Sequence, residues 1–138
     1  SAFLIRILVH GRDVVAAQVP LDVRDPESDL RFDVGRTVGE DGPLTLHERA
    51  GASVLLLTRR AVDALVDDAK AGGRVYESAT AIDGDPGSRI DYDVFHAGAA
   101  DGEYVSGDAR ACEALRRLGH AIHVDPTIVV RRHRIATL

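Results

Sequence analysis

The stretch from Ser106 to Arg134 decides the predicted fold; it reads S-G-D-A-R-A-C-E-A-L-R-R-L-G-H-A-I-H-V-D-P-T-I-V-V-R-R-H-R. A side-chain oxygen of Ser106 or Asp108 can accept from the free backbone amides of a first helical turn. Gly119 suits the left-handed position that ends a helix. Between them, apolar residues recur three or four apart, as one helix face requires, at Ala111, Cys112, Leu115 and Leu118. Two strands joined by an Asp125-Pro126 turn are predicted next, at Ala121 to Val124 and Ile128 to Val130.

Outward from this stretch, helix and strand patterns alternate along the chain. Residues Arg59 to Ala71 form an amphipathic helix pattern that Gly72-Gly73 ends. The continuous apolar run from Ser53 to Thr58 predicts the central strand, and Val14 to Ala17 predicts a second buried strand. Shorter patterns predict a helix at Ala2 to Val9, two pairing strands at Leu30 to Val34 and Leu44 to Glu48, and a strand at Ile90 to Phe95. We therefore expect one α/β domain over residues 1–138, with a mixed β-sheet flanked by helices.

Composition narrows the class of protein. The chain has 138 residues, of which 45% are hydrophobic and 28% charged, as in ordinary soluble domains. No apolar run approaches the roughly 20 residues of a transmembrane helix, and no signal-peptide pattern is present, so we expect a cytoplasmic location. A net charge of −5 argues against nucleic acid as a partner. The single cysteine excludes an internal disulfide and a cysteine-cluster zinc site.

The stretch that begins at Ser106 resembles the end of the catalytic domain of GT-A-type, family 2-like glycosyltransferases. Members of that group often read S-E-D-x-x-F-C-x-R-x-R-x-x-G-Y-x-I-W-V-D-P-x-I-x-V-x-H. This chain departs from the pattern at Gly107, where the family has Glu, and at His123, where it has an aromatic residue. The residues assigned to this frame are Ser106, Asp108, Cys112, Leu115, Arg117, Gly119, Ile122, Val124, Asp125, Pro126, Ile128 and His133, the last of which lies one position beyond the family's His.

Two further stretches carry the same resemblance in the same order. Residues Ile7 to Pro20 are similar to the family's L-L-x-H-D-x-D-V-V-A-G-x-Y-P, and Thr58 to Leu65 fit the second half of T-G-F-M-L-I-R-R-x-V-F-x-x-L. Together they cover the C-terminal two-thirds of a GT-A catalytic domain. The resemblance implies a partial GT-A (nucleotide-diphospho-sugar transferase) fold, whose nucleotide-binding strands and D-x-D motif would lie before Ser1.

The resemblance also implies a chemistry for named residues. Asp108 would be the general base that takes the proton from an acceptor hydroxyl as it attacks the sugar of a nucleotide-sugar donor. His133 would ligate the Mn²⁺ or Mg²⁺ that bridges the donor's phosphates. Arg131 and Arg132, beside it, suit the binding of a diphosphate.

Each of these residues also has a structural interpretation. Asp108 could be an ordinary helix cap, and His133 an exposed histidine among arginines. The acidic triplets that start at Asp83 and Asp91 are typical of turns. Cys112, on the apolar helix face, is expected to be a buried small hydrophobic residue. The other histidines considered lack metal-site spacing and are expected to be structural or on the surface: His10, His96, His120 and His123. The alternative to a glycosyltransferase is a non-catalytic α/β binding or assembly module that keeps only the scaffold.

Overall fold

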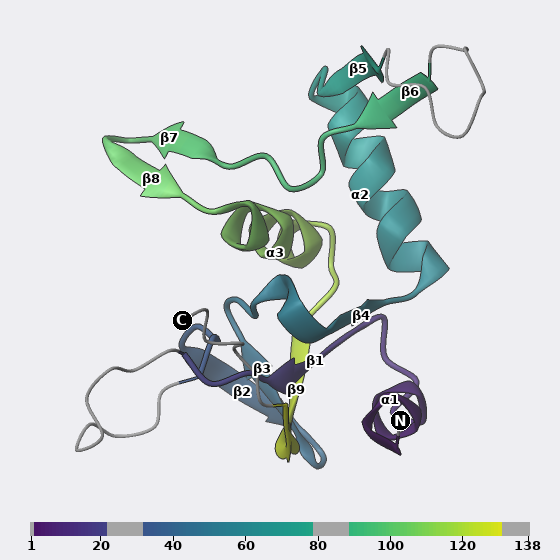
Figure 1. Cartoon of the computed structure of the whole chain (residues 1–138), viewed down its shortest axis with the longest axis vertical. Helices are drawn as coiled ribbons and strands as arrows, with labels where there is room; N and C mark the ends of the chain where they lie inside the picture. Colours follow the sequence, from purple (N-terminus) through teal and green to yellow (C-terminus); the bar gives the residue numbers. More distant parts are fainter. Residues whose placement is uncertain (1, 22–31, 79–88, 131–138) are drawn as a thin grey trace, which may run out of the picture.

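The computed structural model describes residues 2–21, 32–78 and 89–130, and Figure 1 shows an α/β arrangement around one five-stranded sheet. Its strand order is β2-β3-β9-β1-β4. These strands are β1 (Val14–Gln18), β2 (Thr37–Asp41), β3 (Leu44–His47), β4 (Leu55–Leu57) and β9 (Ile122–Val129). The β1 and β9 strands pair in parallel, whereas the other neighbours pair antiparallel, so the predicted mixed sheet is confirmed.

Three α-helices accompany the sheet in the described part of the chain: α1 (Ala2–Leu8), α2 (Arg59–Ala71) and α3 (Gly107–Arg117). Two small antiparallel hairpins stand apart from the main sheet in Figure 1. One pairs β5 (Val75–Ser78) with β6 (Arg89–Tyr92), and the other pairs β7 (Gly98–Ala100) with β8 (Glu103–Val105). A 3₁₀ turn, η1 (Ala52–Val54), leads into β4.

Strand β1 is buried on both of its faces, and this divides the molecule into layers. Val14 and Ala16 face a core cluster that includes Leu65 of α2 and Leu115 of α3. Val15 and Ala17 face the opposite way, into a second cluster that includes Ile7 of α1. Alternate residues of a strand point to opposite faces, so α2 and α3 cover one face of the sheet and α1 packs on the other. The predicted packing of the two long helices on a sheet containing both apolar strands is confirmed.

Both long helices begin and end as their sequences predict. Thr58 caps α2 by accepting from the backbone N–H of Ala61 at 3.4 Å. The φ angles of Gly73 and Gly119, +69° and +90°, place both residues just past the helix ends in the left-handed region, where glycine carries no steric penalty. The strand patterns of Val14 to Ala17 and Leu44 to Glu48 and the helix pattern of Ala2 to Val9 are also confirmed.

The prediction of a central strand at Ser53 to Thr58 was wrong. Ala52 to Val54 form a 3₁₀ turn, and the three remaining apolar residues make β4, which lies at the edge of the sheet. The central strand is β9 instead, and its neighbours β3 and β1 also lie between two partners. A continuous apolar run is therefore compatible with an edge strand when other packed elements shield its faces.

The prediction of two strands separated by an Asp125-Pro126 turn was also wrong. Strand β9 runs without interruption from Ile122 to Val129. The pairing with β1 jumps from Asp125 to Val129, so the residues between them form a bulge rather than a turn. The Asp125 carboxylate accepts from the backbone N–H of Thr127 at 2.9 Å, and an exposed proline, which has no N–H to donate, fits such a bulge.

Other strand predictions were partly wrong. Leu30 and Arg31 lie outside the described residues, and Phe32 and Val34 make isolated bridges to Pro20 and Ala50 instead of pairing with β3. The partner of β3 on that side is β2, for which the sequence analysis predicts no strand. The predicted strand at Ile90 to Phe95 ends earlier, at Tyr92. Within the described ranges, every helix is too short or too polar to cross a lipid bilayer.

Candidate functional site

The candidate base, Asp108, lies in the first turn of α3. Ser106 is the helix cap, because its hydroxyl accepts from the backbone N–H of Ala109 at 3.2 Å. Asp108 instead reaches across to η1, where its Oδ2 accepts from the backbone N–H of Ala52 at 3.1 Å. The capping role considered for Asp108 therefore belongs to Ser106, and the Asp108 carboxylate joins α3 to the turn before the edge strand.

A second side chain of α3 fixes the same segment one helical turn later. The Sγ of Cys112 donates to the carbonyl of Ala50 at 3.5 Å, and Cys112 is 1% exposed. Burial raises the pKa of the Cys112 thiol, which keeps it protonated at neutral pH. The prediction of a buried small hydrophobic residue is confirmed, and together Cys112 and Asp108 hold residues 50–52 against α3.

The start of α3 is also closely covered by the segment after β6. A Cβ atom placed on Gly107 would lie 2.7 Å from the carbonyl oxygen of Phe95, closer than real side chains approach. This is the position at which the resembled family has Glu. A side chain at position 107 would therefore displace the Phe95 backbone.

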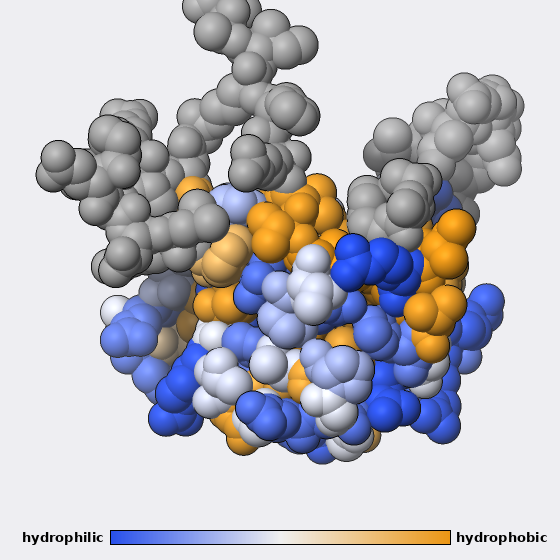
Figure 2. All heavy atoms as spheres, turned by 90° about the horizontal axis from the view of Figure 1, so that it is seen from below, coloured by the Kyte–Doolittle hydropathy of each residue, from blue (hydrophilic) through white to orange (hydrophobic). Residues whose placement is uncertain are grey.

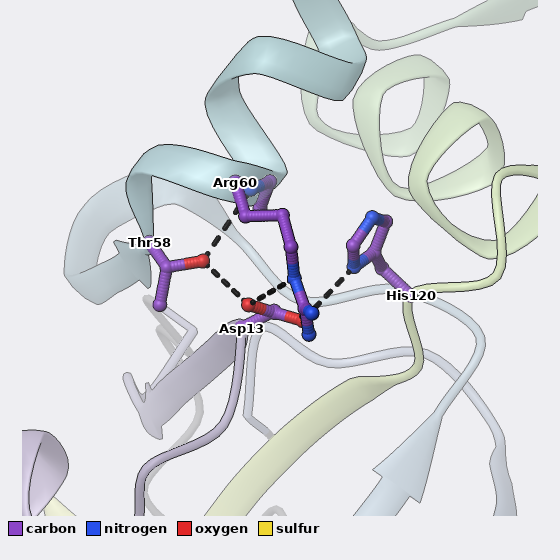
Figure 3. A network of polar contacts seen from close by, with 5 residues as sticks. Asp13, Thr58, Arg60 and His120 are labelled. Atoms are coloured by element: carbon purple, nitrogen blue, oxygen red, sulfur yellow. Dashed lines mark hydrogen bonds and ion pairs between the residues drawn. The ribbon is translucent and has the colours of Figure 1, made fainter.

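The best-connected polar group in the described structure is the carboxylate of Asp13, just before β1 (Figure 3). Arg60 donates to both of its oxygens, Thr58 Oγ1 donates to Oδ1 at 2.6 Å, and His120 Nδ1 lies 3.3 Å from Oδ2. Hydrogen bonds from Arg60 and Thr58 hold the pKa of Asp13 well below its ordinary value despite partial desolvation. Asp13 therefore ties the start of β1 to the start of α2 and to the entry of β9.

Two other acid–histidine pairs join segments around the sheet. Asp41 accepts from Arg12 at 2.8 Å and lies 2.9 Å from Nε2 of His123; bonds from Arg12 first, and then from His123, lower its pKa. His10 Nε2 lies 2.7 Å from the carboxylate of the buried Asp125.

The pKa of Asp125 reflects two opposing effects. Desolvation alone would raise this pKa, but hydrogen bonds from Thr127 and His10 outweigh it, and the pKa lies below the ordinary value. The structural role expected for His10, His120 and His123 agrees with these contacts.

Of the predicted site residues, the structure describes Asp108 alone. Arg131, Arg132 and His133 lie outside the described residues, as does the triplet that starts at Asp83. Asp91, from the second triplet, pairs with Arg89 on the surface hairpin β5–β6 at 3.1 Å. Across residues 2–21, 32–78 and 89–130, no three His, Cys, Asp or Glu side chains are grouped so that they could hold a metal ion. The expectation of Mn²⁺ or Mg²⁺ therefore depends on His133 and on the resemblance.

The described surface includes an uncharged groove and a more open hollow. A groove of about 380 Å³ runs between α1 and the edge strand β4, and its lining, which includes Leu4, Leu8, Val54 and Leu56, contains no charged side chain. It ends at η1, because Ala52 and Ser53 also line it. A more open hollow of about 550 Å³ lies along α2 beside Tyr92, with a mixed charged lining.

Comparison of the chain with protein-family models, with curated proteins and with solved structures gives no match in any of the three.

Proposed function

We propose that this chain is a glycosyltransferase-like domain that, in its intact form, transfers a sugar from a nucleotide-sugar donor to an acceptor hydroxyl. The observation that supports it is the arrangement of the three stretches that carry the resemblance. They form β1, the β4–α2 unit and the α3–β9 unit, and these pack together as adjacent strands with two helices on one face. Segments far apart in sequence thus form one structural unit, as parts of a single catalytic domain would.

Asp108 is the proposed general base. Its Oδ2 is held by the Ala52 N–H, and no hydrogen bond joins its Oδ1 to another described residue. A carboxylate held by one oxygen can accept a proton from an acceptor hydroxyl on the other. The hydroxyl oxygen then forms the bond to the anomeric carbon while the nucleoside diphosphate leaves with the bonding electron pair.

The donor side of the proposal rests on residues outside the described structure. The diphosphate would be bound by Arg131 and Arg132, and the Mn²⁺ or Mg²⁺ by His133. Because the resemblance locates the nucleotide-binding strands before Ser1, we expect the 138-residue chain alone to bind uridine or guanosine diphosphate sugars weakly or not at all. Calorimetry with these donors and Mn²⁺ checks this, and tight metal-dependent binding would contradict the proposed position of the donor site.

The test of the base is Asp108→Asn, measured in the full natural protein. An Asn oxygen can still accept from Ala52, so the melting temperature should change little, whereas the carboxylate base is lost. General-base assistance is worth about 10²–10⁴-fold in rate, and the transfer rate should fall by that factor. Ser106→Ala, which removes the cap and leaves Asp108, is the control: it should lower stability and spare the rate. An unchanged rate in Asp108→Asn would remove Asp108 as the catalyst.

The alternative is a non-catalytic binding or assembly module, and one observation favours it. Four apolar side chains around α1 are 50–73% exposed, beside the uncharged groove at the β4 edge: Leu4, Ile5, Leu8 and Val9. In Figure 2, hydrophobic side chains reach the surface on the right-hand side, where Figure 1 places α1. Exposed apolar side chains beside a groove suit a protein–protein, membrane or ligand-binding site, and the assembly module requires the first of these.

Sedimentation velocity of the isolated chain tests the alternative. If this surface drives assembly, the chain should self-associate with rising concentration, and Leu8→Glu should shift it to the monomer. Val38→Glu is the matched control, because Val38 is similarly exposed, at 48%, but does not line the groove. A chain that stays monomeric at all concentrations would count against assembly through a second copy.

A further inference from the structure

The peptide between Gly51 and Ala52 carries the N–H that holds the proposed base. Its N–H, on Ala52, donates to Asp108 at 3.1 Å, and Ala52 is also the first residue of η1. Whatever fixes this peptide therefore fixes one oxygen of Asp108. The residues that fix it are Arg49 and Asp33.

An ion pair lies against this peptide. Arg49 Nη1 donates to Asp33 Oδ1 at 2.8 Å, with the two side chains 31% and 21% exposed. The backbones are tied as well, since the Gly51 N–H donates to the Asp33 carbonyl at 2.9 Å and the Gly35 N–H donates to the Arg49 carbonyl at 2.8 Å. Residues 33–35 and 49–51 thus form one clamped unit.

The Asp33 carboxylate occupies the space that a side chain at position 51 would need. A Cβ atom on Gly51 would lie 1.9 Å from Asp33 Oδ2 and 2.5 Å from its carboxyl carbon. Gly51 is buried, and its φ of −68° is one that any residue can adopt. A side chain at position 51 would therefore have to displace the Asp33 carboxylate, although the backbone conformation itself would accept one.

We propose that Asp33 is a positioning residue for Asp108: locked by Arg49 and seated on Gly51, it orients the peptide whose N–H holds the Asp108 carboxylate. The inference rests on the proposed function in taking Asp108 as the base, but the contact itself is independent of any activity. Asp33 does not touch Asp108; it acts through the backbone between residues 51 and 52.

Nuclear magnetic resonance of the 138-residue chain tests the contact directly. Two signals report it: hydrogen exchange at the Ala52 amide and the ¹³C resonance of the Asp108 carboxyl. Asp33→Asn keeps the size of the side chain and weakens its pairing with Arg49. Because one net hydrogen bond is worth a factor of about five, exchange at Ala52 should accelerate about fivefold and the Asp108 resonance should shift. Gly51→Ala should produce larger changes in the same two signals.

Two controls separate positioning from a general loss of stability. Gly98→Ala places its Cβ where nothing lies within 4 Å and should leave both signals unchanged. Ser106→Ala weakens the cap of α3 and should lower the melting temperature without moving the Ala52 and Asp108 signals in the folded state. If Asp33→Asn folds and leaves both signals at their wild-type values, the proposal is overturned.

The rate of sugar transfer and the NMR signals of the Ala52–Asp108 hydrogen bond test two different claims. In the full natural protein, Asp33→Asn should lower kcat and leave KM nearly unchanged. Added to Asp108→Asn, it should lower kcat no further, because its effect passes through Asp108. A wild-type rate in Asp108→Asn together with a moved Asp108 signal in Asp33→Asn would reject the proposed base while leaving the clamp in place.

Discussion

At the scale of single residues, two glycines mark where other segments lie against the start of α3 and its partner turn. Gly51 is covered by the Asp33 carboxylate, and Gly107 by the carbonyl of Phe95. At both positions a Cβ atom would collide with a neighbouring segment. Neither glycine has a positive φ, so a left-handed backbone is not the reason for glycine here. The region around Asp108 is therefore shaped by close approaches that a single added methyl group would disturb.

Gly107→Ala tests the close approach at the helix start. In an open helix position, Ala would stabilise by roughly 0.5–1 kcal/mol over Gly. Here the new Cβ would meet Phe95 O, so we expect a loss of about 1–3 kcal/mol, as for other overpacked sites. Urea denaturation measures this free energy of unfolding. Gly98→Ala, in open space, should be neutral or slightly stabilising, and a gain in stability for Gly107→Ala would show that the segment 93–97 yields without cost.

At the scale of elements, side chains at the starts of α2 and α3 cap these helices, and one of them also binds the residue before β1. The hydroxyl of Thr58 has two roles, since it accepts from Ala61 to cap α2 and donates to Asp13 at the start of β1. Ser106 has the first role alone among the described contacts. At the other end of the helices, Asp68 of α2 binds Arg117 of α3 at 2.8 Å and Arg74 beside β5 at 2.9 Å.

The two caps should therefore differ in what they contribute. Replacing a capping Ser or Thr by Ala costs about 0.5–2 kcal/mol. We expect Ser106→Ala near the middle of that range and Thr58→Ala at its upper end, because Thr58→Ala also removes a donor to Asp13. Thr58→Ser keeps the hydroxyl and should recover most of the loss in thermal unfolding. Equal losses for Thr58→Ala and Ser106→Ala would mean that the contact with Asp13 contributes nothing.

Elements whose signals are local were predictable from the sequence. The helix from Arg59 to Ala71 matches its prediction at both ends, because its cap, its apolar stripe and its glycine stop lie within 16 residues. The position of Leu55–Leu57 at the edge of the sheet was not predictable, because an apolar run does not reveal how many partners a strand has. The continuity of β9 depends on a bulge at Asp125, which a turn-forming Asp-Pro pair conceals.

The candidate site was predictable only in part, for a similar reason. Asp108 could be named from its own stretch of sequence, but its partner, Ala52, is 56 residues away. The acid–histidine pairs join residues still further apart: His120 and Asp13 are separated by 107 positions. Each histidine alone shows no metal spacing, and only the folded sheet brings it to its carboxylate.

At the scale of the whole molecule, carboxylates join elements that are far apart in the sequence. Asp13 links β1 to α2, Asp41 links β2 to β9, and Asp68 links α2 to α3. Hydrogen bonds from Arg60, Arg12 and Arg117, respectively, are the largest cause that lowers the pKa of each. Folding therefore favours the ionised form of all three groups.

This arrangement predicts loss of stability in acid. A carboxyl whose pKa is lower in the folded than in the unfolded state stabilises the fold fully above the unfolded value, about 3.9 for Asp, and loses that effect as pH falls through and below it. Urea midpoints should therefore be steady from pH 7 to 5 and fall below about pH 4. Asp13→Asn should be less stable than wild type at pH 7, and the difference should narrow by pH 3. If wild type and Asp13→Asn differ in stability by the same amount from pH 7 to pH 3, ionised Asp13 does not stabilise the fold as described.

The position of β9 also has a consequence for how the chain reaches its fold. This strand is made of residues 122–129, yet it lies between β3 and β1, whose residues come from the first 47 positions. During synthesis, the β2–β3 hairpin and the β1–β4 pair must remain two separate halves until β9 leaves the ribosome. Pairings between such distant segments have a high contact order and form slowly, on the millisecond-to-second scale typical of non-local sheets. Until then the edges of β1 and β3 that β9 will join are unpaired, so the nascent chain is most exposed to wrong strand partners just before β9 arrives.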